Sequence, residues 1–84
     1  MTSVVTLQDR FTIEEVSDRA HQFRDQLGRA DEITVDISSV NIIDIAAIQF
    51  LVSVCKECCL QGKKFFFNSS AAANELMRLS GIQL

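Results

Sequence analysis

The sequence of 84 residues contains no proline, no tyrosine, no tryptophan and only three glycines. It therefore has no stretch rich in proline or glycine that could act as a linker between two domains. A hydrophobic fraction of 48% beside 23% charged residues is also too apolar for a disordered chain. We expect a single compact domain over residues 1–84.

Basic charge and long apolar runs are also scarce. The net charge is −3 and no basic cluster occurs, so the electrostatic attraction on which most nucleic-acid binding depends is missing. No apolar run reaches the roughly 20 residues that span a bilayer, and the N-terminus lacks a basic segment followed by an apolar one. We expect a cytoplasmic protein that binds no nucleic acid and does not insert directly into a membrane.

Motifs of catalysis are missing as well. The sequence has no glycine-rich phosphate loop, no Gly-x-Ser-x-Gly and no His-Glu-x-x-His. The acidic pair Glu14 and Glu15 opens a predicted helix, where the helix dipole favours acidic side chains. The single histidine, His21, falls outside the apolar stripe of that helix and is expected on the surface. We predict that the protein is not an enzyme and holds no cofactor.

The three cysteines, Cys55, Cys58 and Cys59, lie within five positions. Their odd number and close spacing do not suit a disulfide framework. The Cys-x-x-Cys spacing leaves a zinc or redox site as an alternative, but there is no second pair and the histidine is distant in sequence. We interpret them as small apolar residues of a helix in a reducing cytosol, and predict no metal site.

The apolar spacing predicts strands and helices in alternation. Thr12 and Glu15 have the spacing of a capping box, and Asp44 carries oxygens suited to cap the helix that follows it. We predict strands at Val4–Leu7, Ile33–Ile37 and Phe65–Phe67, and helices from Ile13 to near Gly28, from Ile45 to about Gln61 and from Ala71 to about Leu79. This order predicts an α/β fold with a small mixed or parallel sheet and helices packed on it in two or three layers.

Gln8 to Arg10 is expected to be a loop that follows the first strand. The strand Phe65–Phe67 is too apolar to be half exposed. In the helix from Ile45, spacing at 100° per residue predicts a core face and an opposite face in water. The predicted core face comprises Ile48, Leu51, Val52, Cys55 and Cys59; the opposite face comprises Ala46, Gln49, Phe50, Ser53 and Glu57, with Ala47 and Val54 at its border. Phe50 should therefore project into solvent.

Several short motifs occur in a characteristic order. They are Val35-Asp36-Ile37-Ser38, Ile43-Asp44-Ile45-Ala46-Ala47-Ile48, Gly62, Asn68-Ser69-Ser70 and Leu79-Ser80-Gly81-Ile82. Together they cover about fifty residues and resemble a STAS domain, the fold of bacterial anti-sigma factor antagonists. The resemblance implies a non-enzymatic, protein-binding regulatory domain.

Two departures from the family pattern change what the resemblance implies. Ala46 occupies the position of the serine that partner kinases phosphorylate, so this site cannot receive a phosphate and binding should not be switched. The chain also lacks the family's additional N-terminal strand, which would leave a sheet edge in need of cover.

The resemblance implies that partners contact the loop before the second helix and the exposed face of that helix. The candidate partner-binding residues are Asp44, Ile45, Ala46, Ala47, Gln49, Phe50, Ser53 and Val54. Our first hypothesis is constitutive binding of an anti-sigma factor resembling a histidine kinase, or of a chemotaxis complex. The alternative is an accessory subunit that binds the ATPase of a bacterial lipid-transport ABC transporter. A pocket for a nucleotide or lipid is a third, less favoured possibility.

Overall fold

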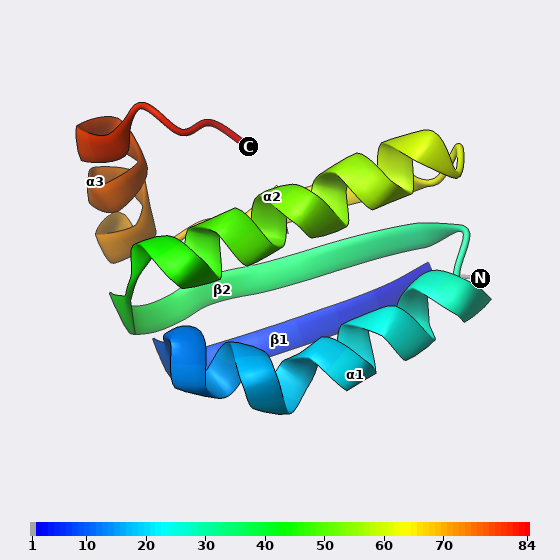
Figure 1. The fold of residues 1–84 in the computed structure, drawn as a ribbon, viewed down its shortest axis with the longest axis horizontal. Coiled ribbons are helices and arrows are strands. Elements are labelled where there is room, and N and C mark those ends of the chain that lie inside the picture. Colours follow the sequence, from blue (N-terminus) through cyan, green and yellow to red (C-terminus); the bar gives the residue numbers. More distant parts are fainter. Residues whose placement is uncertain (1) are drawn as a thin grey trace.

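The computed structural model describes residues 2–84, in which three strands alternate with three helices (Figure 1). The elements are β1 (Thr2–Phe11), α1 (Ile13–Arg29), β2 (Glu32–Ile43), α2 (Ile45–Leu60), β3 (Lys64–Asn68) and α3 (Ala71–Ser80). The predicted α/β order is thus confirmed. No helix among these residues is long and apolar enough to cross a membrane.

The three strands form one open sheet in the order β1-β2-β3, and both neighbouring pairs are parallel. A parallel pair requires a crossover, and crossovers of one hand between successive strands bring their helices to the same face. Figure 1 shows α1 and α2 side by side in front of the sheet. The last helix, α3, stands at the end of the sheet where the strands finish, and packs against β2.

The core lies between the sheet and the pair α1 and α2. Side chains alternate along each strand, so every second residue points to the helices. Val5 and Leu7 of β1 and Ile33, Val35 and Ile37 of β2 are buried in this way. The helices add Phe23, Ile48 and Leu51, and all these residues belong to one hydrophobic cluster.

The helices begin where local capping predicts. The carboxylate of Glu15 accepts hydrogen bonds from the backbone N–H of Thr12 at 2.9 Å and from its hydroxyl at 2.7 Å. Asp44 accepts from the N–H of Ala47, and Ser70 accepts from the N–H of Ala73 at the start of α3. Each cap satisfies a backbone donor that has no partner within its helix.

The predicted loop at Gln8 to Arg10 is wrong, because β1 continues to Phe11. The pairing of β1 with β2 shifts register between Thr6 and Gln8 and again between Asp9 and Arg10. Asp9 has φ 62°, a left-handed conformation that aspartate tolerates better than most residues. The polar residues that indicate a loop therefore mark an irregularity within a long strand.

The prediction that Phe65–Phe67 is too apolar to be half exposed is also wrong. The side chain of Phe66 is 49% exposed, whereas Phe65 and Phe67 turn toward the helices. Phe66 pairs in register with Thr34, and Thr34 pairs with Val4, so these residues form a row across the face away from α1 and α2. Parallel sheets are usually covered on both faces. In residues 2–84, this second face is left open.

Candidate functional site

Asp44 connects the beginnings of two helices. One carboxylate oxygen, Oδ1, accepts from the N–H of Ala47 at 2.9 Å, and the other, Oδ2, accepts from the N–H of Ile13 at 3.0 Å. A single carboxylate thus caps both α1 and α2 at their positive ends. The position that a phosphate could take at these N-termini is filled by the chain's own side chain. The predicted cap of α2 is confirmed. The bond from the N–H of Ile13 to Asp44 was not predicted.

Three exposed isoleucines lie in the chain at or next to the two helix starts that Asp44 connects. Ile13 begins α1, Ile45 begins α2, and Ile42 lies two residues before Asp44 at the end of β2; they are 54%, 36% and 54% exposed, respectively. They lie at the carboxyl ends of parallel strands, the edge at which α/β proteins commonly bind their ligands. We call Ile13, Ile42 and Ile45 the isoleucine edge.

The predicted partner-binding residues divide into accessible and inaccessible groups. Ile45, Gln49 and Ser53 are exposed, and Asp44 and Ala46 are partly so. Ala47 and Val54 are buried, which contradicts their predicted place at the border of an exposed face.

The core face of α2 is turned toward α1 relative to the prediction. Its buried residues are Ala47, Ile48, Leu51, Val54 and Cys58, whereas Val52 and Cys55 are half-buried and Cys59 is exposed. The reason is that α1 packs beside α2 and extends the buried arc in its own direction.

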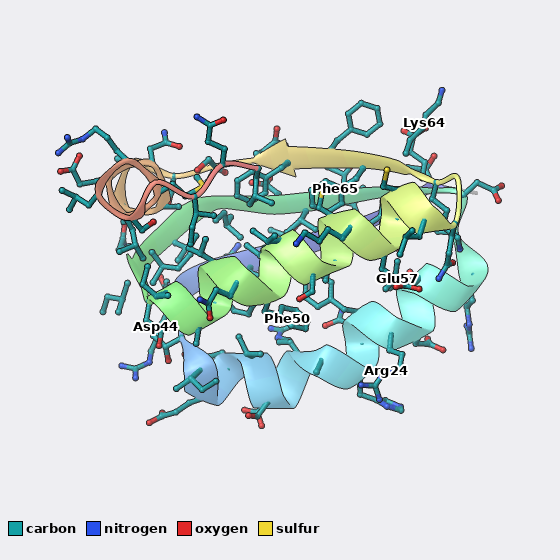
Figure 2. The ribbon with its side chains drawn as sticks, turned by 45° about the horizontal axis from the view of Figure 1, so that its top comes forward. Arg24, Asp44, Phe50, Glu57, Lys64 and Phe65 are labelled. Carbon is teal, nitrogen blue, oxygen red and sulfur yellow. The ribbon has the colours of Figure 1, made fainter. Side chains whose placement is uncertain are left out.

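The prediction that Phe50 projects into solvent is wrong. Its ring is half-buried and meets the rings of Phe23 at a centroid distance of 5.1 Å and Phe11 at 6.3 Å, both edge to face. Such aromatic pairs are favourable beyond the area they bury. Phe50 therefore joins α1 to α2, and Figure 2 shows it between the two helices.

A groove of about 420 Å³ runs between α1 and α2. Its walls include Ala20, Phe23, Leu27, Phe50 and Val54, with Arg24 on α1 and Glu57 on α2 at its rims (Figure 2). The spacing of Val16, Ala20, Phe23 and Leu27 predicts an apolar stripe along α1, but it does not indicate that α2 lies beside this stripe. Ala20, Phe23 and Leu27 of this stripe line the groove toward α2. Their helical spacing was the sequence feature from which an apolar wall could have been predicted.

The cysteines are free, and they differ in exposure. Cys58 is buried, Cys55 half-buried and Cys59 exposed. Burial raises the pKa of the Cys58 thiol, which keeps it protonated and unreactive. Within residues 2–84, no group of three histidine, cysteine or acidic side chains is placed to hold a metal ion.

No protein-family profile matches the chain, and no curated protein matches it either. The resemblance to STAS domains thus stays a prediction based on its motifs. The structure gives several motif residues a local role: Asp36 accepts from the N–H and the hydroxyl of Ser38, Ser70 caps α3, and Gly81 ends α3 with φ 75°. Any small α/β domain needs residues of this kind at such turns.

Proposed function

We propose that this domain is a non-enzymatic protein-binding module whose partner covers the isoleucine edge and the adjoining exposed residues of α2. The observation that carries the proposal is that three exposed isoleucines lie at or next to the two helix starts, where the Asp44 carboxylate already accepts from the N–H groups of Ile13 and Ala47. Fully burying an exposed isoleucine side chain contributes roughly 1.5–3 kcal/mol. Because these three are about half exposed, covering each contributes about half of that, which adds up to a few kcal/mol for a partner that covers all three. Ile45, Ala46 and Gln49 continue the surface along α2.

The binding we propose is constitutive. Ala46 lies in the first turn of α2 and has no hydroxyl to phosphorylate, so the STAS-type switch has no acceptor at this position. The motif resemblance favours an anti-sigma factor resembling a histidine kinase, or a chemotaxis complex, as the partner. The ATPase of a lipid-transport ABC transporter is the alternative. We assign the interaction to the cytoplasm, because three free cysteines suit a reducing compartment.

The test is a comparison of proteins captured by the wild-type chain and by Ile45→Asp, quantified by mass spectrometry after cross-linking in cells. Aspartate is favourable in the first turn of a helix, so the variant should fold normally while placing a charge on the binding surface. We expect the captured partner to fall at least tenfold, which corresponds to a loss of about 1.4 kcal/mol.

Leu60→Lys is the matched control. Leu60 is 82% exposed at the opposite end of α2, where a cation is favoured by the helix dipole. It should capture the partner as the wild type does. The identity of the captured protein then distinguishes the first hypothesis, a kinase-like or chemotaxis partner, from the alternative, an ABC transporter ATPase. If Ile45→Asp retains every protein that the wild type captures, the proposed function is wrong.

A further inference from the structure

The groove between α1 and α2 has an apolar floor and two helical walls. Phe23 and Leu27 come from α1, and Phe50 and Val54 come from α2. The backbone groups of both walls bond within their own helices, so they offer no free N–H or C=O row to an extended peptide. An extended peptide would therefore leave its own backbone groups unpaired against apolar side chains.

Gly28 leaves one end of this groove open. It lies within α1 and has no left-handed backbone, and a Cβ built on it would meet no atom within 4 Å. Neither the backbone conformation nor close packing thus requires glycine here, although glycine is the least favourable helix residue after proline. Because Gly28 has no side chain, space remains beside Leu27 and Gln61 at the end of the groove.

We propose that the groove binds the apolar side of an amphipathic helix, an inference that rests on the proposed function and places a second contact of the same protein partner. A helix bonds its own backbone groups and presents apolar side chains at intervals of three and four residues, which suits a groove with helical walls. A small molecule fits less well, because the groove is open to solvent and would cover only part of it.

The charges at the rims give the bound helix a direction. Arg24 stands on the α1 rim and Glu57 on the α2 rim. A helix with acidic residues along one flank and basic residues along the other matches both rims in one direction only. If a helix is turned end for end with its apolar side still on the groove floor, the flank that faced α1 faces α2. A helix whose acidic and basic flanks are exchanged should therefore bind in the opposite direction.

The probe is an acetylated alanine-based peptide with leucines at i, i+3, i+4 and i+7, glutamates on one flank and lysines on the other. It is titrated into the ¹⁵N-labelled full chain. We expect amide shifts confined to the groove, at Ala20, Leu27, Val54 and Gln61. Gly28→Leu, which fills the open end, should weaken binding at least tenfold, whereas Gly28→Ala should weaken it less than about threefold. Thermal melting of both variants verifies that they fold.

The direction is read with a nitroxide on the peptide's N-terminus. The label should broaden amide signals at one end of the groove with the first peptide and at the other end when the flanks are exchanged. Three results would overturn the proposal: no binding of either peptide, shifts located elsewhere on the domain, or unchanged affinity of Gly28→Leu. Broadening at the same end with both peptides would overturn the role of Arg24 and Glu57.

The two proposals fail in different ways. If Ile45→Asp loses its partner but the peptides do not bind, the proposed function stands and the groove is not a helix site. If the peptides bind in the groove but Ile45→Asp retains all partners, the groove site stands and the assignment of the isoleucine edge is wrong.

Discussion

At the scale of single residues, Glu15 shows how one side chain couples protonation to the start of α1. Its pKa is lowered chiefly by the hydrogen bonds from the hydroxyl and the backbone N–H of Thr12, with a further contribution from the positive charge of Arg10. The guanidinium Nε of Arg10 lies 3.2 Å from the carboxylate. The charged form of Glu15 is therefore favoured in the folded state, because it is the form that accepts these bonds.

The first prediction concerns acid stability. A carboxylate with a lowered folded pKa contributes stability that is present above its unfolded pKa and is lost as the pH falls through the folded pKa. Since the ordinary value is 4.5, this contribution should disappear on acidification below that value. Glu15→Gln should lower the melting temperature at pH 7, and the gap to the wild type should narrow toward pH 3. Circular dichroism melts over this range measure it.

Glu14→Gln is the control for this prediction. The Glu14 side chain is 75% exposed, and its ion pair with Arg10 spans 3.6 Å. Exposed pairs of this kind contribute little, so the variant should follow the wild-type pH profile. A constant gap between wild type and Glu15→Gln from pH 7 to pH 3 would contradict the role of the carboxylate.

At the scale of elements, Asp44 links two helices that are far apart in sequence. Its bond to the N–H of Ala47 spans three residues, whereas its bond to the N–H of Ile13 spans 31. Ser70 provides a comparison, because it caps only α3, by a bond to Ala73 at 3.2 Å. The loss of Asp44 therefore removes the acceptor of two backbone N–H groups, those of Ile13 and Ala47, and the loss of Ser70 removes the acceptor of one.

The second prediction compares these caps by urea unfolding. An N-cap replaced by alanine costs about 0.5–2 kcal/mol, so Ser70→Ala should lower the free energy of unfolding by about 1 kcal/mol. Asp44→Ala should cost roughly twice as much, about 2 kcal/mol, because hydrogen bonds to two backbone N–H groups are removed. Asp44→Asn keeps one acceptor oxygen, so its free energy of unfolding should lie between those of Asp44→Ala and the wild type. Equal losses for Asp44→Ala and Ser70→Ala would show that the bond to Ile13 contributes nothing.

The same distances in sequence explain what could be predicted without the structure. The caps at Thr12 and at Asp44 were predictable because donor and acceptor lie within four residues. The bond from Ile13 to Asp44 was not, since no local pattern relates positions 31 residues apart. Periodicity assigned Ile48 and Leu51 correctly to the core. It misplaced Val54 and Phe50 because a helical period does not show which neighbour covers a helix from the side.

At the scale of the whole molecule, residues 2–84 cover the parallel sheet on one face and leave the other open. Buried residues alternate with exposed ones along β1 and with partly exposed ones along the first half of β2: Val5 and Val35 are buried, Val4 is exposed and Thr34 is partly exposed. Such alternation is more usual in antiparallel sheets. Three phenylalanines in succession suggested a strand buried on both sides, because composition alone does not indicate how many layers a sheet carries.

The last prediction measures this difference between the two faces. Phe23 is buried against the ring of Phe50, so Phe23→Ala should lower the free energy of unfolding by about 3–5 kcal/mol. Phe66 lies on the open face with half of its surface already in water, so Phe66→Ala should cost less than about 1.5 kcal/mol. Urea unfolding at several protein concentrations measures both. Similar losses in the two variants, with a dependence on concentration for the wild type, would mean that another copy of the chain covers Phe66 in solution.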